Sequence, residues 1–291
     1  MKVDKLRTVI IYIIIILLGL VCLLPLLNIV AISFSSSAAV EGNMVGLIPV
    51  GFSTAAYKKI LEDSQFWHSF LISVERVVLA LIINFVLIVL MAYPLSKPNA
   101  QFRGRNIYAN LMIFAMLFNG GMIPTFLVVK SYGLLNTVWA LVLPGAVPIF
   151  NVILVMNFFA AVPKELEEAA FIDGANPFQV LTKIFIPISK PVLATVSLFS
   201  IVGSWNDFYS GLIYMSKAAY YPLMTYIQSL QINVEDLIKQ GNLSAVVDSA
   251  SLGNTNLNAA KIVIAVIPLL LIYPLLQRYF VSGIVVGSVK G

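Results

Sequence analysis

The sequence predicts an all-α, polytopic membrane protein with six transmembrane helices and both termini in the cytoplasm. Three observations support this fold class. First, only 11% of the 291 residues are charged and the mean hydropathy is +0.95, whereas about a quarter of the residues in a soluble domain are charged. Second, apolar segments long enough to span a bilayer, which takes about 20 residues, recur along the chain. Third, Lys and Arg gather in alternate connections, as the positive-inside rule expects.

Six segments meet the length requirement, and the first of them needs a separate argument. The basic residues 1–7 precede an uncharged run from Thr8 to Val40. Its apolar part is roughly twice the 7–15 residues of a signal peptide, so we interpret it as a retained helix, although the small residues 37–39 resemble a cleavage site. The six expected spans are 9–33, 71–95, 107–129, 137–160, 188–215 and 260–280.

The distribution of Lys and Arg gives the orientation of these spans. With the N-terminus inside, most of the 18 basic residues fall in short cytoplasmic segments. Two long loops, 34–70 and 216–259, then lie outside, and we expect short helices within 53–69 and 220–241. The basic residues assigned to the inside are Lys2, Lys5, Arg7, Lys97, Arg103, Arg105, Lys164, Lys183, Lys190, Arg278 and Lys290.

The expected organisation follows from the spans and their orientation. The N-terminal tail and first helix occupy 1–34, and an extracellular loop occupies 35–65. A core of five helices occupies 66–280 and contains a cytoplasmic loop at 163–187 and an extracellular loop at 216–259. A cytoplasmic tail occupies 281–291.

Several kinds of chemistry are absent from the sequence. No GxxxxGK[ST] motif is present, so the chain has no P-loop with which to bind ATP. The single cysteine, Cys22, and the single histidine, His68, exclude an intrachain disulfide and a Cys or His metal cluster. Ionisable residues are scarce in the spans, which argues against an ion-coupled pump. We therefore predict no catalytic and no metal site, and the net charge of +5 is no sign of nucleic-acid binding because basic residues gather in cytoplasmic loops.

Polar and aromatic residues inside the spans are candidates for a substrate pathway. The segment GSWNDFY contains Trp205, Asn206 and Asp207, and FNGGMIP contains Asn119 next to a Gly-Gly pair and a proline. Aromatic faces stack on sugar rings, while amides and carboxylates accept hydroxyl hydrogen bonds. Helices broken by glycine and proline often line a passage. The alternatives are an interfacial aromatic belt and ordinary helix kinks.

The cytoplasmic loop at 163–187 predicts a helix–turn–helix. Pro163 suits a first helical position, and the acidic residues that follow favour the positive end of a helix. Gly174 is a natural helix stop, and Asn176 followed by Pro177 is typical of a new N-terminus. An amphipathic helix lying on lipid headgroups is the alternative, but such helices usually carry Lys and Arg rather than Glu on the polar face.

This loop resembles the signature of permease subunits of bacterial ATP-binding-cassette (ABC) importers. That signature is E-A-A, three residues, G, nine residues, I, one residue and L-P. The spacing here agrees throughout, with isoleucine replacing leucine at the penultimate position. The corresponding residues, with Asp173 in the turn between them, are Glu168, Ala169, Ala170, Gly174, Ile184, Ile186 and Pro187.

The resemblance extends from about residue 66 to the end of the chain. The ending YPLLQRYFVSGIVVGSVKG and the segments GSWNDFYSGLIYM and YYPLMTYIQ are similar to sugar permeases of the maltose and multiple-sugar branch. The smaller permease subunits of that branch, above all those for polysaccharides and complex oligosaccharides, are the nearest type. The resemblance implies the type I ABC importer permease fold in a bacterial plasma membrane.

The resemblance also implies partners and roles. In the family the loop is a coupling helix that docks on an ATPase subunit, so ATP and magnesium are expected on partner chains and no cofactor on this one. Expected partners are a second homologous permease, two ABC ATPase subunits, an extracellular sugar-binding protein and membrane lipid. By the same resemblance the tail Gly287–Gly291 would reach between the ATPase subunits, with a plain soluble tail as the alternative. Importers of other solutes and a secondary carrier of a neutral solute remain as alternative functions.

Overall fold

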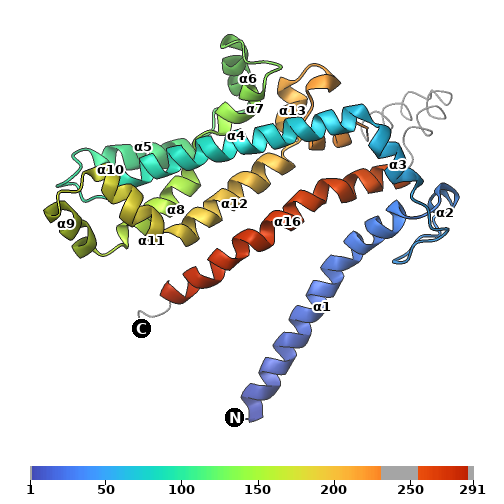
Figure 1. The fold of residues 1–291 in the computed structure, drawn as a ribbon, viewed down its shortest axis with the longest axis horizontal. Helices are drawn as coiled ribbons and strands as arrows, with labels where there is room; N and C mark the ends of the chain where they lie inside the picture. The colour runs from blue at the N-terminus through green and yellow to red at the C-terminus, as the bar shows by residue number, and fades with distance from the viewer. Residues whose placement is uncertain (1, 231–254, 288–291) are drawn as a thin grey trace. The chain divides into compact units, whose positions relative to one another are not determined.

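The computed structural model describes residues 2–230 and 255–287 and divides the chain into two compact units. Unit 1 comprises residues 1–68 and 226–268, and unit 2 comprises residues 69–225 and 269–291. Figure 1 shows that the described residues form helices and connecting loops, and no strand occurs among them. The predicted all-α class is therefore confirmed for this part of the chain.

Unit 1 consists of short helices between long apolar ones. It contains α1 (Lys2–Ser33), α2 (Ser37–Glu41), α3 (Ala55–Glu62) and the first part of α16 (Thr255–Gly287). The most apolar window of α1 is 0% buried within the chain. Such a surface is stable only in contact with lipid or another apolar chain, as expected for a membrane-spanning helix.

Polar contacts join the distant ends of unit 1. The Asp63 carboxylate, just before α4, accepts hydrogen bonds from Lys261 Nζ at 2.8 Å and from Tyr226 Oη at 2.9 Å. Asn256 Nδ2 donates to the carbonyl of Ser35 at 3.3 Å. These contacts connect residues near the start of α16 to the region around α2 and α3.

Unit 2 is built on the long helix α4 (Ser64–Leu95), of which residues from Ser69 onward belong to it. Figure 1 shows α9, α10 and α11 together at the end of this unit that also holds the C-terminus of α4. The other elements are α5 (Arg105–Leu117), α6 (Met122–Ser131), α7 (Val138–Val142), η1 (Leu143–Gly145), α8 (Ile149–Ala160), α9 (Lys164–Ile172), α10 (Pro177–Val180), η2 (Leu181–Phe185), α11 (Ile186–Ile188), α12 (Lys190–Asn206), α13 (Tyr209–Tyr214) and η3 (Ala218–Tyr220).

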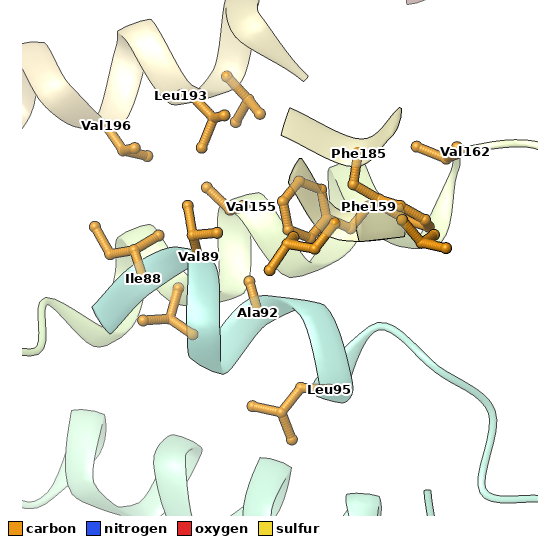
Figure 2. Packing of buried hydrophobic residues seen from close by; sticks show 14 of the residues in the cluster. Ile88, Val89, Ala92, Leu95, Val155, Phe159, Val162, Phe185, Leu193 and Val196 are labelled. Atoms are coloured by element: carbon orange, nitrogen blue, oxygen red, sulfur yellow. The ribbon is translucent and has the colours of Figure 1, made fainter. Parts of the chain in front are cut away.

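The core of unit 2 lies between α4, α8 and α12. Val89 and Ala92 of α4 face Val155 and Phe159 of α8, and Val196 of α12 completes the contact (Figure 2). Each of these side chains is at most 4% exposed, so the three helices are held by dense apolar packing. Residues from η2 join the same cluster, which attaches the loop at 163–187 to the core.

The expected spans agree only in part with the helices. Arg7–Ser33, Ser64–Leu95 and Thr255–Leu275 are continuous helices long and apolar enough to cross a bilayer. The expected spans 107–129 and 137–160 are pairs of helices, bent by 111° at 118–121 and by 47° at 146–148. The expected span 188–215 contains α12 and α13, and an 84° bend at Ser189 separates α12 from the helical segment Pro177–Ile188 of the loop. The span expected over 107–129 is broken at Gly120 and Gly121, and Gly121 has φ +91°; a broken helix here is one of the alternatives that the sequence left open. The described residues thus contain three helices long and apolar enough to cross a membrane, or up to six such segments if each bent pair counts as one.

The predicted loop helices fall partly within the described residues. Within 53–69 the chain forms α3 and then, after Asp63, the start of α4, so this span begins at Ser64 rather than at residue 71. Thr54 is the N-cap residue of α3, without a side-chain capping bond. Residues 223–230 are helical, while the rest of the helix expected over 220–241 lies outside the described residues, as do residues 288–291 of the tail.

Candidate functional site

The loop at 163–187 has the predicted helix–turn–helix form. Helix α9 begins at Lys164, and Pro163 precedes it as the N-cap residue instead of occupying the first helical position. The reason is its ψ of 131°, which is extended rather than helical. Glu165 and Glu167 lie in the first turn, where the helix dipole stabilises negative charge.

Gly174 makes the turn between the two helices possible. Its N–H donates to the carbonyl of Phe171 at 3.1 Å, and the N–H of Ala175 donates to the carbonyl of Ala170 at 2.9 Å. This pair of bonds is a Schellman motif, which needs a left-handed residue at the position that Gly174 occupies with φ +80°. A residue with a Cβ would be strained there.

The second helix of the loop starts at a complete capping box. The Asn176 side chain accepts from the backbone N–H of Gln179, and the Gln179 side chain accepts from the backbone N–H of Asn176, both at 2.9 Å. Pro177 occupies the first helical position, as expected. The helix then changes to a π-helical turn, η2, before α11. Such turns often occur at functional sites.

The signature residues divide into an exposed group and a packed group. Glu168, Ala169, Asp173 and Gly174 are exposed, as are the apolar side chains of Phe171 and Ile172 between them. In contrast, Ala170, Ile184 and Ile186 are half-buried against the core of unit 2, and Pro187 is exposed at the start of α11. The loop therefore presents a surface while remaining tied to the bundle.

A second site is a polar cavity of about 260 Å³ inside unit 2. Two of its lining residues, Arg76 of α4 and Asp207 after α12, form an ion pair across 131 residues of sequence. Arg76 also donates to the carbonyl of Asp207 at 2.8 Å and to that of Leu141 at 3.4 Å. The remaining polar lining is uncharged: Asn84, Asn151, Ser200, Ser204, Ser210 and Tyr214.

Arg76 and Asp207 neutralise each other, and the other residues that line the cavity are uncharged. Asn84 lies 3.1 Å from Ser200 Oγ, so amide and hydroxyl groups are also joined across the cavity between α4 and α12. Arg76 is only 3% exposed, and its Nε has no hydrogen-bond partner. The cavity thus offers hydrogen-bonding groups in an otherwise apolar bundle and no net formal charge.

The four predicted pathway residues do not form one cluster. Asp207 lines the cavity, but Trp205 is 4% exposed and packs edge-on against Phe70 with ring centroids 5.6 Å apart. Asn206 is exposed at the end of α12, and Asn119 is exposed in the break between α5 and α6, where it accepts from the N–H of Gly121. Their substrate roles remain predictions.

Sequence reasoning missed Arg76 and the amide and hydroxyl lining of the cavity. The available signal was a lone arginine at the edge of an apolar span, because an unpaired charge there is costly and needs a partner. Among the described residues no group of three or more His, Cys, Asp or Glu side chains could hold a metal ion.

The chain matches known proteins of one family along nearly its whole length. Residues 2–286 match the family model described as "Binding-protein-dependent transport system inner membrane component". The chain is 41% identical to Protein LplC of Bacillus subtilis (strain 168) over 273 residues, covering 94% of this chain and 91% of that protein. It is 39% identical to the polygalacturonan/rhamnogalacturonan transport system permease protein YtcP of the same organism over 288 residues, covering 99% of both.

A solved structure has the same architecture. It is a chain of a bacterial ABC transporter involved in the import of the acidic polysaccharide alginate. The TM-score is 0.84 with 32% sequence identity, over 96% of this chain and 98% of that chain.

Proposed function

The chain belongs to the family of binding-protein-dependent transport system inner membrane components, and we propose that it is one of two permease subunits of an ATP-driven importer of an oligosaccharide or polysaccharide. Its partners would be a second, homologous permease, two ATPase subunits and an extracellular sugar-binding protein. Membership of this family argues against the secondary carrier considered above. A permease of this kind is a transporter subunit and not an enzyme.

The observation that carries the proposal is the exposed surface of the loop at 163–187. Ala169 and Gly174 have no side chain beyond Cβ, so a groove of a partner could close on the backbone of α9. Glu168 and Asp173 are exposed as well and can accept hydrogen bonds from that partner. Closure of the ATPase pair would then pull the loop and tip the helices between inward-open and outward-open states.

The cargo assignment is supported by the relatives and by the cavity. The named functions of YtcP and of the alginate importer concern polysaccharides. A lining of amides, hydroxyls and a neutralised ion pair suits the many hydroxyl groups of a sugar. Asn119, Trp205, Asn206 and Asp207 remain the proposed pathway residues. Import of a different solute class is the alternative cargo.

The proposed topology places the chain in the plasma membrane with both termini inside. The loop at 163–187 would then face the cytoplasm, and the loops at 34–70 and 216–259 would receive the binding protein. The boundaries proposed above follow this topology, with the core at 66–280 and the tail at 281–291. ATP and magnesium would bind to the partner ATPases, and this chain would hold no cofactor of its own.

The experiment uses the complete importer with single substitutions in the loop. Glu168→Lys and Gly174→Asp are each expected to leave the chain in the membrane and to reduce sugar uptake at least about tenfold, because they remove the exposed acceptor or the left-handed turn. Glu165→Lys is the control, since it makes the same charge change on the same helix outside the signature. Normal uptake with either test variant would contradict the assignment.

A further inference from the structure

Lys97 lies two residues after the end of α4 and is joined to its last turn by backbone hydrogen bonds. Its backbone N–H donates to the carbonyl of Pro94 at 3.2 Å, and the preceding Ser96 donates to Ala92 at 2.9 Å. Ala92 is fully buried in the core of unit 2. A force on the side chain of Lys97 therefore acts on the end of α4.

The ammonium group of Lys97 is bound to helix α9. Its Nζ lies 2.7 Å from both carboxylate oxygens of Glu167, seventy residues further along the chain. The two side chains are 11% and 12% exposed, so water screens the pair only weakly. Burial lowers the pKa of Lys97 from its ordinary value of 10.5, and the hydrogen bond and charge of Glu167 oppose that shift.

The same ammonium group also contacts the second half of the loop. Its Nζ lies 4.1 Å from the ring centroid of Phe185, in η2, and 4.2 Å from that of Tyr93, in α4. The two rings meet edge to face at 5.1 Å, and Phe185 packs in the same way on Phe159, as Figure 2 shows. A cation within about 6 Å of an aromatic face is attracted to it, most strongly where water is excluded.

Two adjacent glutamates of the loop consequently lie in different surroundings. Glu167 points inward to Lys97, while Glu168 is exposed on the surface assigned to the ATPase. One turn of α9 thus carries Glu167, which contacts the helix bundle, beside Glu168, which is proposed to contact the ATPase.

We propose that Lys97 is a positioning residue that transmits movement of the coupling loop to α4. It binds both halves of the loop, through Glu167 of α9 and Phe185 of η2, to the end of a helix that continues to the polar cavity. The proposal rests on the function proposed above. Without Lys97 the loop would still dock on the ATPase, but its displacement would reach α4 less fully.

The test measures sugar uptake per ATP hydrolysed in the reconstituted importer, together with retention of the ATPase subunit. Lys97→Met keeps the length of the side chain and removes its charge, and Glu167→Gln removes the charge of its partner. Both are expected to retain the ATPase and to lower uptake per ATP, by about tenfold for Lys97→Met. Lys97→Arg preserves the cation and is expected to retain most of the wild-type uptake per ATP hydrolysed.

The control is Lys164→Met, which removes an exposed lysine from the same loop. If Lys97→Met takes up as much sugar per ATP hydrolysed as the control does, the proposal is overturned. Loss of the ATPase subunit from both Lys97→Met and Glu167→Gln would also overturn it, because the pair would then serve assembly rather than transmission. Normal transport by Glu168→Lys would contradict the proposed function itself. Normal uptake per ATP in Lys97→Met, with transport lost in Glu168→Lys, would contradict only the role of Lys97.

Discussion

The ion pair in the polar cavity gives a quantitative prediction. Asp207→Ala leaves the guanidinium of Arg76, which is 3% exposed, without its carboxylate. Breaking a fully buried pair costs about 3–5 kcal/mol. The Asp207 side chain is 28% exposed to the cavity, so water replaces part of the lost interaction and we expect about 2–3 kcal/mol. This loss corresponds to a fall of roughly 5 °C in the unfolding midpoint.

The assay is thermal unfolding of the purified importer in lipid nanodiscs. Asn206→Ala serves as the control because it changes the neighbouring, exposed residue. The double variant Arg76→Met/Asp207→Leu removes both charges and is expected to recover most of the loss, since no unpaired charge remains. A midpoint for Asp207→Ala equal to that of Asn206→Ala would refute the reasoning. A double variant as unstable as the sum of its single changes would refute it as well.

Three further predictions concern packing, pH and the loop. A Cβ at Gly211 would overlap the buried side chain of Thr225, so Gly211→Ala should lower stability by about 2 kcal/mol in thermal unfolding, and an unchanged midpoint would contradict this close packing. Burial opposes ionisation of Asp63, but Lys261 and other hydrogen-bond donors outweigh it and hold the pKa of Asp63 below 3.8. Its stabilisation is therefore complete well above that pH and is lost as the pH falls through the lower native value. Asp63→Asn should reduce the fall of the unfolding midpoint between about pH 5 and pH 2. Asn176→Ala should cost about 1 kcal/mol of local stability, seen as faster amide exchange in α10; unchanged exchange would contradict the role of the capping box.

Features that depend on neighbouring residues could be predicted from the sequence. Gly174 and Asn176 act through backbone hydrogen bonds to residues three or four positions away, so their types alone indicate the turn and the new helix. The family signature in the loop added only the proposed role of its exposed residues. The continuous helices at both ends of the chain followed from hydropathy, because an apolar run of sufficient length has few alternatives.

Features that depend on distant residues could not be predicted in this way. The partners Arg76 and Asp207 are separated by 131 positions, and Lys97 and Glu167 by 70, so no local pattern connects them. Trp205 has an aromatic face that could stack on a sugar ring, yet tertiary packing against Phe70 buries it. The bends within two of the expected spans, and the bend at Ser189 before α12, also depend on tertiary packing, since glycine and proline permit a bend without setting its angle.

The most direct test of the account is to identify what touches the exposed side of α9. The chain has a single cysteine, Cys22, so replacing it with serine allows one new cysteine to carry a photoreactive cross-linker. A probe at Ala169 is predicted to form an adduct with the nucleotide-binding subunit in the assembled importer. A probe at Ile48, in the loop assigned to the outside, is predicted to form none with that subunit. Absence of the nucleotide-binding subunit from the Ala169 adducts, or its equal capture from Ile48, would contradict the proposed coupling.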